Sequence, residues 1–361
     1  MQSEHWGGSA MAVGHSDNGS LGAVDSPSVA KPGLARWSWG LLWLTIGVIV
    51  GGSLVRATGA GDGCGDSWPR CQGSLFPLEG GTETAIEFSH RLATAGLGLV
   101  LLWFVFAAWR AGPGATTNIR EVGLWRSLRA WRNPGEGRDL RRALGWVGIF
   151  FMGEVLIGAL LVLAGWVDTD ASIGRTITVP LHLVNTFLLV GAVVLVVHLA
   201  NGGVWPRYDR QRRSNQIGMV IVGVMLLIAA SGGLNALADT LFPPDTLIDG
   251  IREEFGPTAP FLVRLRILHP MLAIGGGLTV VMLLRSPSFD RAGSVRKLAN
   301  LAGGIVGVEA VVGLVNVVLL TPVEVQLVHL LIADVIWVVA SLAVIRVLAA
   351  STEVTAQMES V

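Results

Sequence analysis

The chain has 361 residues, of which 52% are hydrophobic and only 14% are charged. Soluble domains carry about 25% charged residues, so this composition excludes an ordinary soluble protein and favours a membrane protein. The formal net charge is zero, and no overall basic field indicates binding to nucleic acid.

The first segment, 1–35, is rich in Gly and Ser and contains no apolar run. Because such a segment cannot bury a core, we expect a disordered cytoplasmic tail. Eight apolar segments follow, each close to the roughly 20 residues that a helix needs to cross a bilayer. The predicted spans are 37–58, 87–109, 144–166, 178–200, 216–238, 261–284, 299–320 and 326–346. Residues 347–361 are expected to form a short polar cytoplasmic tail.

Positive charge is concentrated in alternate connections between the predicted helices. The basic connections are 110–142, 201–215 and 285–297, whereas the others carry mainly Asp and Glu. Because basic loops stay on the cytoplasmic side of a membrane, both termini are predicted to be cytoplasmic and the first loop extracytoplasmic. The predicted fold class is an all-α membrane protein with eight transmembrane helices, N-in and C-in.

The order of features repeats along the chain. The third segment of each four-helix half contains Glu-x-x-x-Gly, at Glu154 and Glu309, and the fourth bears His-Leu near its start, at His182 and His329. Membrane proteins often duplicate a half and place sites within or between the repeats. We therefore predict two pseudo-symmetric four-helix bundles, although Gly-rich apolar helices also resemble each other by composition. The N-terminal half, cytoplasmic linker and C-terminal half are predicted at 36–200, 201–215 and 216–346.

Histidines mark equivalent places in the two halves. One lies in the outer part of the second and fourth segments of each half, at His90, His182, His269 and His329. Imidazole is costly within a bilayer and is a common iron ligand. A lone histidine would favour a structural role, but two per half in apolar surroundings favour bis-histidine heme sites. His198, about 24 Å further along its helix than His182, is expected to be an interfacial residue.

Three arginines near the outer helix ends, Arg56, Arg264 and Arg266, are candidates to pair with heme propionates. Anchoring at the membrane interface explains them equally well, so both interpretations stay open. Pro270 follows His269 and frees the carbonyl of Arg266, so it is expected to bend the sixth helix.

The only two cysteines, Cys64 and Cys71, lie in the first outer loop. Their spacing is compatible with a local disulfide, which persists outside the cytoplasm, and a staple or a redox role remains open. Glu87 and His90 are three residues apart and share a helix face. Glu87 would handle protons beside a bound heme, or would only stabilise the helix N-terminus.

The stretch Gly52–Cys71, which holds both cysteines, and the sequence Glu87-Phe-Ser-His90-Arg91 resemble the heme A synthase family. The resemblance extends over roughly 37–346 and includes the eight helices and four histidines. It implies an enzyme of the bacterial plasma membrane that converts heme O to heme A for terminal oxidases. The C8 methyl of heme O would be hydroxylated twice, and the product would lose water to give a formyl group.

The resemblance also implies residue roles and partners. A heme b cofactor is implied in the C-terminal half and the substrate, heme O, in the N-terminal half. The expected partners are a heme O synthase, which transfers the farnesyl group, the lipid bilayer, and an electron acceptor or donor that the sequence does not identify. The connection 239–260 lacks the second cysteine pair of some members. The implied site residues are catalytic Glu87, substrate-heme ligands His90 and His182, cofactor ligands His269 and His329, and disulfide partners Cys64 and Cys71.

Two other functions compete with this interpretation. The histidine pairs alone also permit a di-heme b-type electron-transfer protein, which would leave heme chemistry unchanged. A transporter is suggested by the repeat and by Glu154 and Glu309 within the membrane, for which a structural hydrogen bond is the default expectation. Asp334 is given no role. The cysteine–glutamate–histidine stretch favours the enzyme over both.

Overall fold

The computed structural model describes residues 32–77, 80–110, 137–289 and 293–359. The described chain is helical and contains no named strand. Eight of its helices are long and apolar enough to cross a membrane. The predicted all-α fold with eight spans is thereby confirmed, and the chain is a multi-pass membrane protein. The elements are α1 (Pro32–Ala57), η1 (Ala60–Asp62), α2 (Thr82–Arg110), α5 (Arg138–Leu163), α6 (Ile173–Ala200), α7 (Arg213–Leu241), α8 (Leu247–Glu254), α9 (Phe261–Leu265), α10 (Leu268–Leu284), α11 (Gly293–Val318) and α12 (Val323–Glu359).

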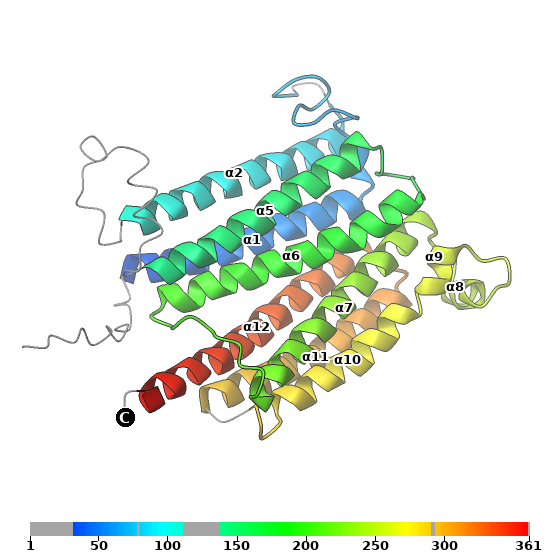
Figure 1. Ribbon diagram of the computed structural model, residues 1–361. Helices are drawn as coiled ribbons and strands as arrows, with labels where there is room; N and C mark the ends of the chain where they lie inside the picture. Colours follow the sequence, from blue (N-terminus) through cyan, green and yellow to red (C-terminus); the bar gives the residue numbers. More distant parts are fainter. Residues whose placement is uncertain (1–31, 78–79, 111–136, 290–292, 360–361) are drawn as a thin grey trace, which may run out of the picture.

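Four helices form the centre of the molecule, and the other four long helices lie outside them. The central helices α1, α6, α7 and α12 pack against one another, with α2 and α5 beside α1 and α6, and α10 and α11 beside α7 and α12 (Figure 1). The division of the chain into two four-helix halves stays a prediction, as does the pseudo-symmetry between the halves.

The core joins the halves through close packing of apolar side chains. Val190 and Val193 of α6 and Ile221 of α7 are fully buried in one continuous cluster. Trp337 of α12 is also buried, and its indole Nε1 donates a hydrogen bond to the carbonyl of Phe187 on α6, at 2.6 Å. Helices in membranes associate through such packing and interhelical hydrogen bonds.

The sixth span, Phe261–Leu284, has the predicted bounds and is interrupted near its start, in agreement with the bend expected from Pro270. Helix α9 ends at Leu265 and α10 begins at Leu268, so Arg266 and Ile267 form a turn between them. The break lies where Pro270 leaves the carbonyl of Arg266 without its helical donor, which is the expected physical cause. His269 therefore stands in the first turn of α10.

Other boundaries also differ from the predictions. Helix α1 begins at Pro32, inside the segment expected to be a tail, and α12 continues to Glu359, past the predicted end at 346. The rest of the N-terminal tail, residues 1–31, and most of the basic connection 110–142 lie outside the described residues.

The two ends of the helix bundle carry different connections. The described residues between α1 and α2, together with α8 and α9, lie at one end (Figure 1). The start of α1, the end of α12 and the arginine-containing connection between α6 and α7 lie at the other end. Which end faces the cytoplasm remains the prediction made from charge.

Candidate functional site

A disulfide closes the loop between α1 and α2. Cys64 and Cys71 are bonded, with Cα atoms 4.4 Å apart, and both residues are buried. Gly63 lies so close to α2 that a Cβ there would be 2.5 Å from the backbone carbon of Glu83, which only glycine permits. Thr84 Oγ1 donates to the carbonyl of Gly63 at 2.7 Å. The loop is therefore fixed on the first turn of α2.

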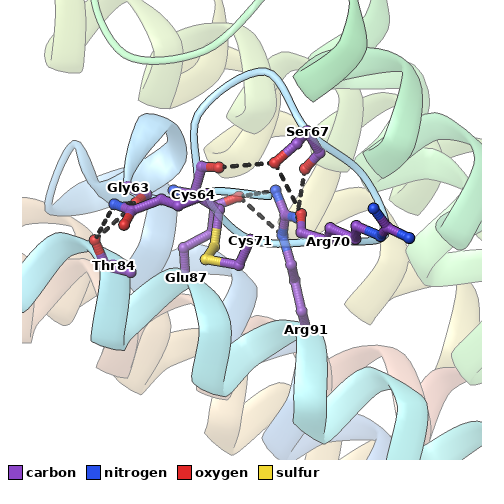
Figure 2. Close-up of polar contacts among 9 residues, drawn as sticks. Gly63, Cys64, Ser67, Arg70, Cys71, Thr84, Glu87 and Arg91 are labelled. Atoms are coloured by element: carbon purple, nitrogen blue, oxygen red, sulfur yellow. Dashed lines mark hydrogen bonds and ion pairs between the residues drawn. A yellow bond between two sulfur atoms is a disulfide. The ribbon is translucent and has the colours of Figure 1, made fainter. Parts of the chain in front are cut away.

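Glu87 connects this loop to its helix through both carboxylate oxygens (Figure 2). Oε2 accepts a hydrogen bond from the backbone N–H of Cys64 at 2.7 Å, and Oε1 accepts one from Nε of Arg91 at 3.0 Å. Arg91 Nη2 also pairs with Glu87, while Nη1 donates to the carbonyls of Ser67 and Arg70 at 2.8 Å each. A carboxylate and a guanidinium thus clamp the loop from one helix face.

His90 lies one turn beyond Glu87, against α1. A Cβ on Gly52 would come to 2.9 Å from Cε1 of His90, so glycine makes room for the imidazole ring. The other histidine of this half, His182, lies on α6. Nδ1 of His90 is buried and has no hydrogen-bond partner in the described part of the chain.

His182, on α6, lies beside a carboxylate from α5. Its Nδ1 is 3.4 Å from Oε2 of Glu154. Asn185 Nδ2 donates to Oε1 of the same carboxylate at 2.6 Å, and Thr186 Oγ1 donates to Oε2 at 3.0 Å. Glu154 is therefore held by three side chains of one α6 face.

The structure brings His269 and His329 together in the C-terminal half. Their ring centroids are 6.2 Å apart, with the planes at 82°. Ser231 Oγ of α7 lies 3.1 Å from Nδ1 of His269. A Cβ on the neighbouring Gly232 would be 3.1 Å from Cε1 of His269, so this ring also rests against a glycine.

His329 repeats the carboxylate contact of His182. Its Nδ1 lies 3.1 Å from Oε1 of Glu309 on α11. One turn further along α11, a Cβ on Gly313 would be 3.2 Å from Cε1 of His329. The ring thus lies against a carboxylate and a glycine of the same helix.

The separation of the C-terminal histidine pair is compatible with two imidazole ligands on one iron. Two imidazoles that share one iron, with metal–nitrogen bonds of about 2 Å, have centroids about 6 Å apart. The C-terminal pair, at 6.2 Å, agrees with that separation. Among the described residues, no group of three or more His, Cys, Asp and Glu side chains is arranged to hold a metal ion. Two histidines would suffice for a heme iron, because the porphyrin itself supplies the other four nitrogen ligands.

The three arginine candidates occupy different surroundings. Arg56 reaches across to the other half, where it donates to the carbonyl of Ala236, to Thr240 and to Gln326 at 2.8–3.0 Å. Arg266 is buried at the break before α10, and its Nε lies 3.0 Å from Oδ1 of Asp239. It also donates to the carbonyls of Ala238 and Phe242. Arg264 is exposed and donates to the carbonyl of Pro257 at 2.6 Å.

Sequence reasoning did not predict several of these contacts. It noted Glu154 and Glu309 as repeated acids but did not pair them with His182 and His329. These pairings could have been predicted from the sequence, because in each half the acid lies on the third helix and the histidine on the fourth. No such pattern indicated the Ser231–His269 contact. His198, expected to be interfacial, contacts the carbonyl of Val204 in the next loop at 3.1 Å.

Comparison with known proteins gives matches of two kinds. A protoheme IX farnesyltransferase of Thermus thermophilus is 36% identical over 308 residues, which is 84% of this chain but 46% of that protein. The chain thus spans about half the length of this curated relative. Two heme A synthases match shorter stretches. That of Lysinibacillus sphaericus is 36% identical over 36% of each chain, and that of Staphylococcus epidermidis is 49% identical over 18% of this chain and 21% of its own.

A sequence model of the COX15-CtaA family, described as cytochrome oxidase assembly protein, matches residues 35–341. That range reaches into all eight spans and contains the disulfide loop and the four histidines. With the heme A synthases among its relatives, the chain belongs to this family of heme A synthases.

Proposed function

We propose that the protein is a heme A synthase, which oxidises the C8 methyl of heme O to a formyl group. Two successive hydroxylations would give a geminal diol, and loss of water would give the formyl product. The observation that carries the proposal is the turn Glu87–His90 of α2 beneath the disulfide loop, in a chain that belongs to this family. Each hydroxylation removes electrons from the methyl carbon, so the reaction requires an external redox partner.

The N-terminal half, 36–200, is proposed to bind the substrate. His90 and His182 would hold heme O, and Glu87 would accept or deliver protons at the methyl carbon. In support, Glu87 lies one turn from His90 and is buried among polar partners that fix its carboxylate. The disulfide loop lies directly against Glu87, and it would close the site from the outer side.

The C-terminal half, 216–346, is proposed to hold a heme b cofactor. His269 and His329 would be its ligands, and their 6.2 Å centroid separation supports this assignment. Heme b in that position would supply one-electron redox chemistry. Arg56, Arg264 and Arg266 remain candidates to pair with propionates, in addition to the protein groups that each already contacts.

The expected partner is a heme O synthase. The relative named a farnesyltransferase aligns to this chain over less than half of its own length. A segment similar to this chain thus occurs within a larger protein of that name, which supports the proposal that the two activities work together. We place the protein in the bacterial plasma membrane, with the disulfide loop on the extracytoplasmic side.

The direct test is heme extraction and mass analysis from a bacterial host that makes heme O but no heme A. Expression of the chain is expected to produce a heme with the mass of the formyl product. Absence of that species, with the protein present in the membrane, would contradict the proposal. A second experiment uses a host that makes only heme b. Appearance of farnesylated heme in that host would instead show the farnesyltransferase activity after which the Thermus relative is named.

The catalytic role of Glu87 requires a variant that keeps the loop in place. Glu87→Gln preserves an amide oxygen for the Cys64 N–H, so heme should still bind while formation of heme A falls at least about 100-fold. Arg91→Gln is the matched control, since it breaks the same ion pair but keeps the carboxylate. An equal loss in both variants would assign Glu87 to loop attachment alone.

A di-heme electron-transfer protein is the second candidate. It is favoured by the similarity of the two sites, because both place a glutamate beside Nδ1 of one histidine. This function predicts two reversibly reducible b hemes in the purified protein and unchanged heme in the host, so the same extraction decides between the candidates.

A further inference from the structure

Each half places one carboxylate beside one histidine, in the same way. Glu154 comes from α5 and lies 3.4 Å from Nδ1 of His182 on α6. Glu309 comes from α11 and lies 3.1 Å from Nδ1 of His329 on α12. In both pairs the carboxylate takes the Nδ1 side, so the other ring nitrogen, Nε2, remains available for a ligand.

We propose that Glu154 and Glu309 are positioning residues that orient His182 and His329 and strengthen them as iron ligands. This inference rests on the proposed heme sites. A carboxylate at Nδ1 favours the tautomer that carries its proton there, which leaves the lone pair of Nε2 for the metal and raises its basicity. A more basic ligand and a nearby negative charge both stabilise ferric over ferrous iron.

Glu154 is well placed for this task because neighbouring side chains hold its carboxylate. Both glutamate side chains are only 15% exposed, within helices that cross the membrane. Asn185 and Thr186, one turn beyond His182, bond the two oxygens of Glu154 at 2.6 and 3.0 Å. The face of α6 that carries the ligand therefore also fixes the carboxylate that orients it.

In the C-terminal half, the rings of both His269 and His329 lie against a glycine. Gly313, four residues after Glu309, lies against the ring of His329, whereas the corresponding Gly158 of the N-terminal half has no neighbouring side chain within 4 Å of a built Cβ. The opposite ligand, His269, also has a partner in Ser231. The structure gives a ring separation for this histidine pair, so Glu309 offers the sharper test.

The test is Glu309→Gln in the purified full-length protein, compared with wild type and with Glu324→Gln. Glu324 lies exposed near the start of the same helix as His329, so its variant removes one charge without touching the ligand. Loss of a ligand-orienting partner typically weakens metal binding about 10–100-fold. We expect heme b to dissociate 10–100-fold faster from Glu309→Gln and at the wild-type rate from Glu324→Gln.

The reduction potential gives a readout that is independent of activity. At a fixed potential, the ferrous-to-ferric ratio of the heme that remains in Glu309→Gln should rise about tenfold, equivalent to about 59 mV for one electron. Wild-type values for both dissociation and potential would overturn the inference. If Glu309→Gln does not accumulate, Glu309→Asp places the carboxylate further from Nδ1, and heme retention equal to wild type would likewise overturn it.

Failure of the proposed function has a different signature. Wild-type protein purified without any heme would contradict the heme sites themselves. Wild-type protein that binds heme and makes heme A, together with an unaffected Glu309→Gln variant, would contradict only the positioning role. Glu154→Gln is expected to act in the same way on heme O added to the N-terminal site, with heme b in the other half unchanged.

Discussion

At the scale of single residues, the burial of the disulfide between Cys64 and Cys71 favours a structural role for it. The sequence left a staple and a redox exchange equally open. In the structure Cys64 and Cys71 are 0% and 1% exposed, so a thiolate cannot attack either sulfur unless the loop opens. Glu87 and Arg91 keep it closed, through the backbone of Cys64 and the carbonyls of Ser67 and Arg70.

Replacing Glu87 with Ala is therefore expected to make the disulfide reducible. The variant removes the acceptor for the N–H of Cys64 and for Arg91, and each buried group left unpaired costs about 1–3 kcal/mol. Reduction by dithiothreitol, followed by alkylation and mass measurement, should proceed about tenfold faster than in wild type or more. Glu83→Ala, at an exposed position of the same helix turn, should leave the rate unchanged. Equal rates in the two variants would show that Glu87 does not hold the loop.

At the scale of elements, hydropathy predicts which segments form helices that cross the membrane, but it does not predict where these helices end or break. All eight spans were found because each is a long apolar run. The continuation of α12 to Glu359 was missed because a helix can extend past the membrane with polar residues. Helix α8 was missed because it is short and largely polar, although Thr246 caps it by accepting from the N–H of Asp249 at 3.1 Å. Pro270 did indicate the bend before His269.

The break between α9 and α10 depends on Arg266, which the sequence offered only as a propionate partner. Arg266→Met leaves the carboxylate of Asp239 and the carbonyls of Ala238 and Phe242 without this donor. Removing one partner of a buried ion pair costs about 3–5 kcal/mol, so the thermal midpoint in detergent should fall clearly. Arg264→Met, two residues away and exposed, should change stability by no more than about 0.5 kcal/mol. Similar midpoints for the two variants would contradict this role.

At the scale of the whole molecule, the sequence predicted the contents of each half but not the contacts between them. The repeat and the family resemblance placed two histidines in each half. Which atoms meet across helices is decided by tertiary packing, so hydropathy could not indicate that Arg56 reaches α7 and α12 or that Trp337 bonds Phe187. These contacts join the central helices of the two halves.

These contacts predict that the halves stay associated after the chain is cut between them. A protease site inserted near Tyr208, which is 52% exposed in the connection between α6 and α7, allows cleavage of the folded protein. The cut halves should copurify in detergent, since the central helices remain packed. Trp337→Ala removes a buried indole and its hydrogen bond to Phe187, a change that costs about 3–5 kcal/mol and should weaken association about 100-fold or more. Trp37→Ala, 60% exposed on α1, is the matched control, and equal separation of the halves in both variants would show that Trp337 does not hold them together.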